Sequence, residues 1–211
     1  MSRKTVTCPN CGATVEYLWS AAVQTTCSFC RSILVRRDVN VEKVGEVADL
    51  PPDSSPIQIS TEGIYQKKPF VVVGRILYEY ERGGWNEWHL VFNDGSSGWL
   101  SDAQLEYAVS FLRKAPQPLP PAEKLQPNQS FSWYGVLYRV TTITPAQYRG
   151  VEGELPFQYW DKKEVPFADL RSDQARFATI DYSDPEPLLF LGESVQFEDL
   201  RLKNVRLFEG W

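Results

Sequence analysis

Histidine is nearly missing from this chain, whose 211 residues include only His89. A metal centre built from several histidines therefore cannot form within one chain, and a Ser-His-Asp or Cys-His catalytic site would require this one residue. We expect His89 to be structural, because it stands between Trp88 and Leu90 in a predicted strand. The chain also lacks the G-x-x-x-x-G-K-S/T loop that cradles nucleotide phosphates. With no catalytic or cofactor-binding residue to assign, the sequence predicts a protein that is not an enzyme.

Long apolar runs are absent as well. No segment approaches the roughly 18 consecutive apolar residues that suggest a membrane-spanning helix. The segment from Met1 to Val6 is short and polar and shows no secretory signal. We therefore expect a soluble cytoplasmic protein that associates with a membrane only through a partner.

Cysteine is scarce, and all four copies stand in two C-x-x-C pairs. The pairs are Cys8-Pro9-Asn10-Cys11 and Cys27-Ser28-Phe29-Cys30, with 15 residues between them. This spacing is typical of a zinc site, and four thiolates leave no open position for a catalytic water. The sequence predicts that Cys8, Cys11, Cys27 and Cys30 hold one structural Zn²⁺.

Iron and disulfides are the alternatives for these cysteines. A disulfide between two cysteines that are separated by only two residues would cross-link little of the chain, which disfavours disulfides. Rubredoxin-like iron carriers usually have Cys-Pro-x-Cys-Gly at the second knuckle, whereas this chain has Cys27-Ser28-Phe29-Cys30-Arg31. The missing Pro and Gly remove part of the loop whose hydrogen bonds to sulfur help set an iron centre's potential. Iron is therefore the less favoured metal.

The charge distribution bears on nucleic-acid binding. Residues 1–37 carry five basic side chains and one acidic side chain, a formal +4, and the remaining 17 basic and 26 acidic residues give −9. Four bound thiolates with Zn²⁺ would lower the first segment to about +2. Because nucleic-acid affinity depends on many phosphate contacts, this balance makes a nucleic acid an unfavoured partner.

Beyond the cysteines, the pattern indicates short antiparallel strands separated by turns. Ser32 to Arg37 is predicted to close the ribbon, and the period-2 alternation from Leu105 to Phe111 predicts a half-buried strand. Five prolines in residues 115–127 exclude a sheet interior there. The predicted protein is mainly β, with a zinc ribbon at 1–38, a linker at 39–56, a first β module at 57–114, a Pro-rich linker at 115–127 and a second β module at 128–211.

The two β modules resemble each other. Residues 62–76 and 129–143 align without gaps at an offset of 67, so that Phe70 matches Leu137 and Ile76 matches Ile143. We interpret this as a duplication that produces two small antiparallel sheets or barrels packed side by side with a pseudo-twofold relation.

Carboxylates gather around the predicted hairpin that ends the first module. They are Glu79, Glu81, Glu87, Asp94 and Asp102. We interpret them as solvated charges on loops and edges, while a paired acid and base stays open.

Several short motifs resemble the bacterial family catalogued as domain of unknown function 4178. They are Pro69-Phe70, Gly74-Arg75-Ile76, Trp85-Asn86-Glu87-Trp88, Asp94-Gly95 and Gly98-Trp99-Leu100-Ser101, within roughly residues 57 to 200. Family members often place a zinc-ribbon segment ahead of the β region. The resemblance implies no reaction or catalytic residue, but it implies an accessory role in a bacterial membrane-stress system.

Tryptophans supply the candidate partner surface, since Trp and Tyr dominate both small β cores and binding hot spots. Trp85 follows Gly83-Gly84 at a predicted turn, so Trp85 with Trp88 is the candidate partner-binding pair, and Trp99 is assigned to the core. The favoured function is a non-enzymatic zinc-binding adaptor for protein partners. The alternatives are a rubredoxin-like iron electron carrier, a zinc-ribbon nucleic-acid-binding protein and a small-molecule pocket in the β modules.

Overall fold

Strands make up most of the molecule. The computed structural model describes residues 4–37, 40–47, 50, 54–158 and 163–208. Within these residues the only helices are two short 3₁₀ segments, η1 (Ala122–Lys124) and η2 (Glu198–Leu200), and none has the length and apolarity to cross a bilayer. The predicted mainly β class is confirmed.

The cysteine-containing segment consists of two small antiparallel sheets. Strands β1 (Lys4–Thr7) and β2 (Thr14–Tyr17) form a hairpin, and β3 (Gln24–Thr26), β4 (Ser32–Arg37) and β5 (Asn40–Glu46) form a three-stranded sheet. The predicted closing strand is β4. Strand β5 lies in the segment assigned to the linker, and it pairs with the free edge of β4, so the ribbon extends to Glu46. Linker residues 38, 39, 48, 49 and 51–53 lie outside the described residues.

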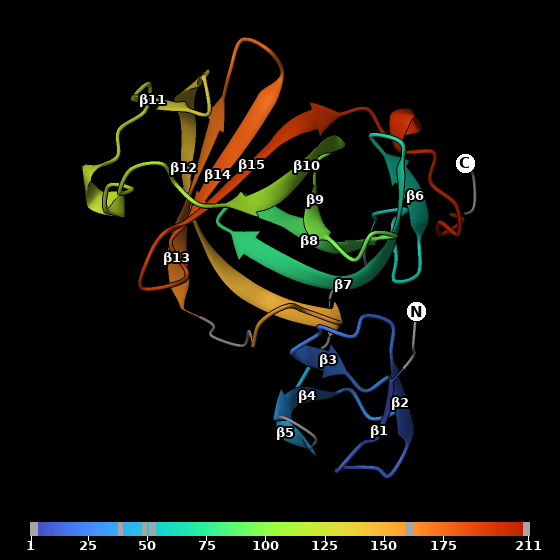
Figure 1. Cartoon of the computed structure of the whole chain (residues 1–211). Coiled ribbons are helices and arrows are strands. Elements are labelled where there is room, and N and C mark those ends of the chain that lie inside the picture. Colours follow the sequence, from blue (N-terminus) through green and yellow to red (C-terminus); the bar gives the residue numbers. More distant parts are fainter. Residues whose placement is uncertain (1–3, 38–39, 48–49, 51–53, 159–162, 209–211) are drawn as a thin grey trace.

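A single ten-stranded antiparallel sheet contains the remaining strands. They are β6 (Glu62–Tyr65), β7 (Lys68–Tyr80), β8 (Gly83–Phe92), β9 (Ser97–Ala103), β10 (Glu106–Arg113), β11 (Ser130–Trp133), β12 (Val136–Gly153), β13 (Glu164–Arg171), β14 (Arg176–Asp181) and β15 (Leu188–Val195). Their order is β11-β12-β13-β14-β15-β10-β9-β8-β7-β6, and β12 also pairs with β7. Strands β7–β10 and β12–β15 therefore close into a ring, with β6 and β11 on opposite sides of it (Figure 1).

The two predicted modules are the two halves of this closed sheet. Strands β6–β10 and β11–β15 have the same order, and the offset of 67 places β6 over β11 and β7 over β12. The halves join by hydrogen-bonded pairing at β10·β15 and β7·β12, so they do not form two separately closed sheets. Joining the edges satisfies the N–H and C=O groups that each half would leave unpaired. Residues 115–127 connect the halves and contain η1. The duplication itself stays a prediction.

The buried residues of the sheet form three apolar clusters. One contains Trp88 and Val109, one lies within the closed sheet around Tyr78, and one surrounds Trp133. A β-bulge in β7 between Val72 and Gly74 switches the face of the strand that the following residues present. The same strand can therefore contribute to the first and second clusters.

Strand β10 begins one residue later than the sequence pattern predicts, at Glu106 instead of Leu105. Tyr107 and Val109 are buried strand residues, as predicted, but Leu105 is 77% exposed. Gln104 and Leu105 form the two-residue turn with φ of 53° and 69°. Two positive φ values correspond to the type I′ geometry that matches strand twist, so the turn determines the position of Leu105.

Trp85 and Trp88 lie within strand β8 and not at a turn. The turn between β7 and β8 contains only residues 81 and 82, so Trp85 is already paired with Tyr78 in the sheet. The Trp85 ring stacks on Tyr78 at 5.0 Å and meets Phe167 edge-on at 5.5 Å. Trp88 has no exposed surface and belongs to the first cluster. The sequence pattern predicts a longer turn; the short turn instead places Trp88 in the interior and leaves Trp85 partly buried against the second cluster.

We expect Trp85→Ala to lower the free energy of unfolding by about 3 kcal/mol, because it leaves a cavity among packed rings. Chemical denaturation monitored by circular dichroism measures the change. Leu105→Ala, which shortens an exposed side chain, should cost less than about 0.5 kcal/mol. Equal, small effects of the two substitutions would contradict the assignment of Trp85 to the core.

Candidate functional site

The four cysteines meet at one point. Their sulfur atoms all lie within 4.8 Å of one another, and the Sγ–Sγ distances are 3.6 Å for Cys8–Cys30 and 3.8 Å for Cys11–Cys27. A tetrahedral site with metal–sulfur bonds of about 2.3 Å has sulfur–sulfur edges of about 3.8 Å. The predicted residues are thus placed to bind a metal ion.

The two knuckles share one backbone conformation. The N–H of Gly12 donates to the Cys8 carbonyl oxygen at 2.9 Å, and the N–H of Arg31 donates to the Cys27 carbonyl oxygen at 2.9 Å. The residue after each second cysteine has a positive φ, 74° at Gly12 and 60° at Arg31. Arg31 therefore adopts the conformation that glycine favours, although its Cβ makes this conformation more costly.

Hydrogen bonds favour the ionised form of one ligand. Cys8 and Cys27 are buried at the base of the site, Cys30 is partly buried and Cys11 is exposed. The Cys30 Sγ lies 3.2 Å from the Ser32 hydroxyl. Hydrogen bonds from Ser32 and Asn10 lower the pKa of the Cys30 thiol to about 5. A thiolate is the form that binds a metal, so this environment suits a ligand.

The ribbon is attached to the closed sheet by backbone pairing and by a buried carboxylate. Gln24 of β3 and Leu155, which follows β12, form a β-bridge, with the Leu155 N–H donating to the Gln24 carbonyl at 2.9 Å. The Glu154 carboxylate accepts the backbone N–H groups of Leu18 at 2.5 Å and Trp19 at 2.8 Å. Only 3% of Glu154 is exposed, and burial raises the pKa of this carboxyl to about 7.

His89 is a core residue at the same junction. Its Nδ1 lies 3.0 Å from the Glu154 carbonyl oxygen, and because a carbonyl only accepts, Nδ1 carries the proton. Its ring is 5.0 Å from those of Trp19 in the ribbon and Trp99 in β9. Burial lowers the pKa of His89 to about 4, so the imidazole is neutral at physiological pH.

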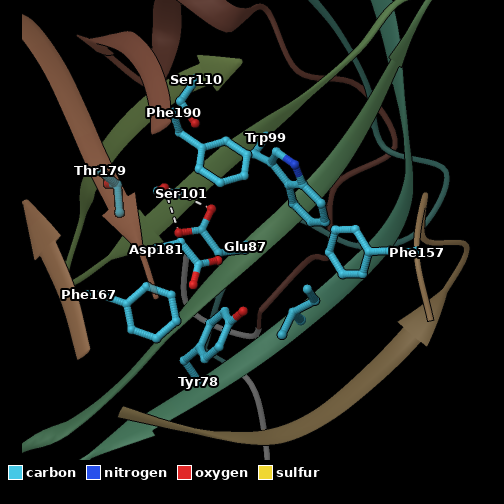
Figure 2. Close-up of a pocket in the computed structure, with 11 residues that line it drawn as sticks. Tyr78, Glu87, Trp99, Ser101, Ser110, Phe157, Phe167, Thr179, Asp181 and Phe190 are labelled. Carbon is cyan, nitrogen blue, oxygen red and sulfur yellow. Dashed lines mark hydrogen bonds between the residues drawn. The ribbon is translucent and has the colours of Figure 1, made fainter. Parts of the chain in front are cut away.

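A small cavity lies inside the closed sheet (Figure 2). It has a volume of about 50 Å³, and every strand of the ring except β12 contributes to its wall. The apolar part of the wall comes from Ile76, Tyr78, Trp99, Phe157, Phe167 and Phe190, and the polar part from Glu87, Ser101, Ser110, Thr179 and Asp181.

The interpretation as solvated charges is wrong for Glu87 and for Asp102. Glu87 lines the cavity rather than an exposed edge, and its Oε1 accepts the Trp85 indole N–H at 3.0 Å and the Ser101 hydroxyl at 2.8 Å. Burial raises the pKa of Glu87 to about 8. The strand pattern contains a signal for this, because Glu87 shares one face of the strand with Trp85 and His89, and the other face carries Trp88 and Leu90. A strand with two apolar faces has no solvated side.

The other carboxylates have different surroundings. Asp94 is exposed and pairs with Lys68 at 2.7 Å. Asp102 is buried, where it accepts the Trp88 indole N–H at 3.4 Å and bonds to the Ser55 hydroxyl. Asp181, from the second half, lines the cavity beside Glu87 and was not singled out by the sequence pattern.

Comparison with known proteins finds one family. The family model described as Domain of unknown function (DUF4178) matches residues 58–197. This range contains β6–β15, the cavity and Glu154, and it leaves out the four cysteines. No curated protein and no solved structure matches the chain.

We expect Glu154→Ala to loosen the ribbon from the closed sheet. Without the carboxylate, two buried backbone N–H groups have no acceptor, which costs about 2 kcal/mol and corresponds to about 30-fold faster amide exchange at Leu18 and Trp19. Hydrogen exchange followed by mass spectrometry measures this rate. Glu123→Ala, at an exposed position in η1, serves as the control. Unchanged exchange in Glu154→Ala would show that the β-bridge alone holds the ribbon.

Proposed function

This chain belongs to the DUF4178 family, and we propose that it is a non-enzymatic adaptor in which four cysteines hold one structural Zn²⁺. The convergence of the four sulfur atoms within 4.8 Å is the observation that carries the proposal. Four thiolates complete a tetrahedral shell, so the ion would have no open position for a substrate or a water. Its role would be to hold the two knuckles together.

Zinc is favoured over iron by the second knuckle. Ser28 and Arg31 occupy the positions where iron-binding knuckles of the rubredoxin type usually have Pro and Gly. A hydroxyl from Ser32 bonds to Cys30 there. A structural ion fits this arrangement because it requires thiolates but no tuned potential.

Phe29 is the best candidate for a contact with a protein partner. It lies between Cys27 and Cys30 at the tip of the second knuckle, and 72% of it is exposed. A large aromatic side chain on a metal-stabilised turn is the type of residue that dominates binding hot spots. Phe29 therefore takes the place of Trp85 and Trp88 as the proposed partner contact. In the accessory role that the family resemblance implies, the partner would belong to a membrane-stress system.

Metal analysis tests the zinc assignment. We expect protein purified without added metal to contain one zinc per chain and to show no visible absorbance. Cys27→Ser should lose the zinc and make residues 4–37 sensitive to protease, while residues 57–208 stay folded on their own clusters. Ser28→Ala, at a neighbouring residue that offers no thiol, should keep the metal. One iron per chain with thiolate charge-transfer bands would instead identify an electron carrier.

Affinity purification of the tagged full chain tests the adaptor role. We expect a protein that co-purifies with the wild type to be reduced at least tenfold with Phe29→Ala, because removal of a hot-spot aromatic costs more than about 1.4 kcal/mol. Zinc content should be unchanged. Leu105→Ala, which shortens an exposed side chain on the closed sheet, should retain the same protein. Equal recovery with both variants would contradict the proposed contact.

A further inference from the structure

Two carboxyl groups, one half-buried (Glu87) and one buried (Asp181), face the cavity of the closed sheet without a cation. Glu87 on β8 and Asp181 on β14 come from opposite halves of the sheet, and Figure 2 shows their side chains next to each other. Among the described residues, no lysine or arginine forms an ion pair with either. The neighbouring charges that act most strongly on Glu87 are the carboxylates of Asp169 and Asp181. The cavity therefore concentrates acidic groups.

The hydrogen bonds that Glu87 and Asp181 receive supply no positive charge. Glu87 receives neutral donors from Trp85 and Ser101, and Asp181 receives the backbone N–H of Ser183 at 2.7 Å. Asp181 is only 9% exposed. Buried charges are normally paired, because removing an ionised carboxylate from water costs several kcal/mol. Ionising such a cluster is therefore costly unless a ligand supplies positive charge.

The rest of the wall is aromatic. Trp99, Phe157, Phe167 and Phe190 line the cavity together with Tyr78. Trp99 and Phe157 stack on each other at 5.9 Å, and Phe167 meets Tyr78 edge-on at 4.9 Å. Aromatic faces attract ammonium groups and also bury apolar carbon. This wall suits a ligand with one charged end and a short hydrocarbon body.

We propose that the cavity binds a small organic cation, with its ammonium group at Glu87 and Asp181 and its hydrocarbon body against the aromatic rings. A water-sized group needs about 10–15 Å³, so a volume of about 50 Å³ accepts roughly three to five non-hydrogen atoms. A divalent metal ion fits less well, because Ca²⁺ or Mg²⁺ needs about six oxygen ligands and most of this wall is hydrocarbon. The site is separate from the four cysteines and does not depend on their metal.

Binding of a cation should be coupled to loss of a proton. Burial raises the pKa of Glu87 to about 8 and also raises the pKa of Asp181, so Glu87 is mostly protonated at neutral pH. The groups around Glu87 are Ile76 of β7, Trp85 and neutral His89 of β8, Ser101 of β9, and the acids Asp169 of β13 and Asp181 of β14. All of the charged ones are acids. The cation should therefore bind more tightly as the pH rises through about 8.

The first test compares two probes of similar size on the full-length wild-type protein. Isothermal titration calorimetry at pH 8.5 should detect one n-propylammonium ion per chain, whereas 1-propanol should not saturate in the same concentration range. At pH 6.5 the affinity for n-propylammonium should fall at least about tenfold, because Glu87 must lose its proton. Equal binding of the two probes, or binding of neither, would overturn the proposal.

The second test removes each charge while keeping the shape of the side chain. Glu87→Gln and Asp181→Asn should each weaken n-propylammonium binding at least tenfold at pH 8.5. Glu164→Gln, at an exposed position at the start of β13, removes one negative charge elsewhere and should leave the affinity unchanged. Circular dichroism confirms that each variant is folded. Unchanged affinity in both cavity variants would overturn the proposal, and the wild-type comparison decides the question if a variant fails to fold.

Discussion

The pairing between β7 and β12 is the constraint on which the rest of the structure depends. It converts two open meanders into a closed sheet, and it requires very close approach of the two backbones where Gly74 is paired with Gly153. A Cβ at Gly74 would lie 2.0 Å from the Glu154 carbonyl oxygen, and one at Gly153, where φ is 66°, would lie 2.2 Å from the Val73 carbonyl oxygen. Only glycine fits at these two positions. This pairing, the β7·β12 seam, therefore depends on glycines from both halves of the sheet.

The same seam positions the ribbon. Glu154 and Leu155 directly follow the glycine that ends β12, and they provide the carboxylate and the backbone bridge that hold the ribbon. Trp19 of the ribbon packs against His89, which bonds to the Glu154 carbonyl oxygen. The metal knuckles are consequently presented at a fixed place on the sheet. Such an arrangement would suit the proposed adaptor role, because preorganised contacts lose little conformational entropy on binding.

Closure of the sheet also creates an interior with unusual electrostatics. Inward-facing positions of an eight-stranded closed sheet surround a space that side chains fill or that holds one small ligand. Here the space is lined by aromatic rings and by carboxylates whose pKa values burial raises. These carboxylates oppose stability when ionised, since the unfolded chain would lose the same protons at lower pH. Residues that cost stability in this way are commonly found at functional sites.

The sequence by itself determined the β class and the four cysteines that are placed to bind a metal ion, because both depend on short-range spacing. The two residues between Cys8 and Cys11 define a knuckle independently of the rest of the fold. The alternation at Tyr107 and Val109 follows from the geometry of one strand. Tertiary structure alone decided that the two halves share one sheet, that Trp88 is interior with Trp85 partly buried, and that Glu87 meets Asp181. The last pair is 94 residues apart in the chain. Their proximity depends on the β7·β12 and β10·β15 seams, and strand pairing at such separations leaves no mark in the local pattern of residues.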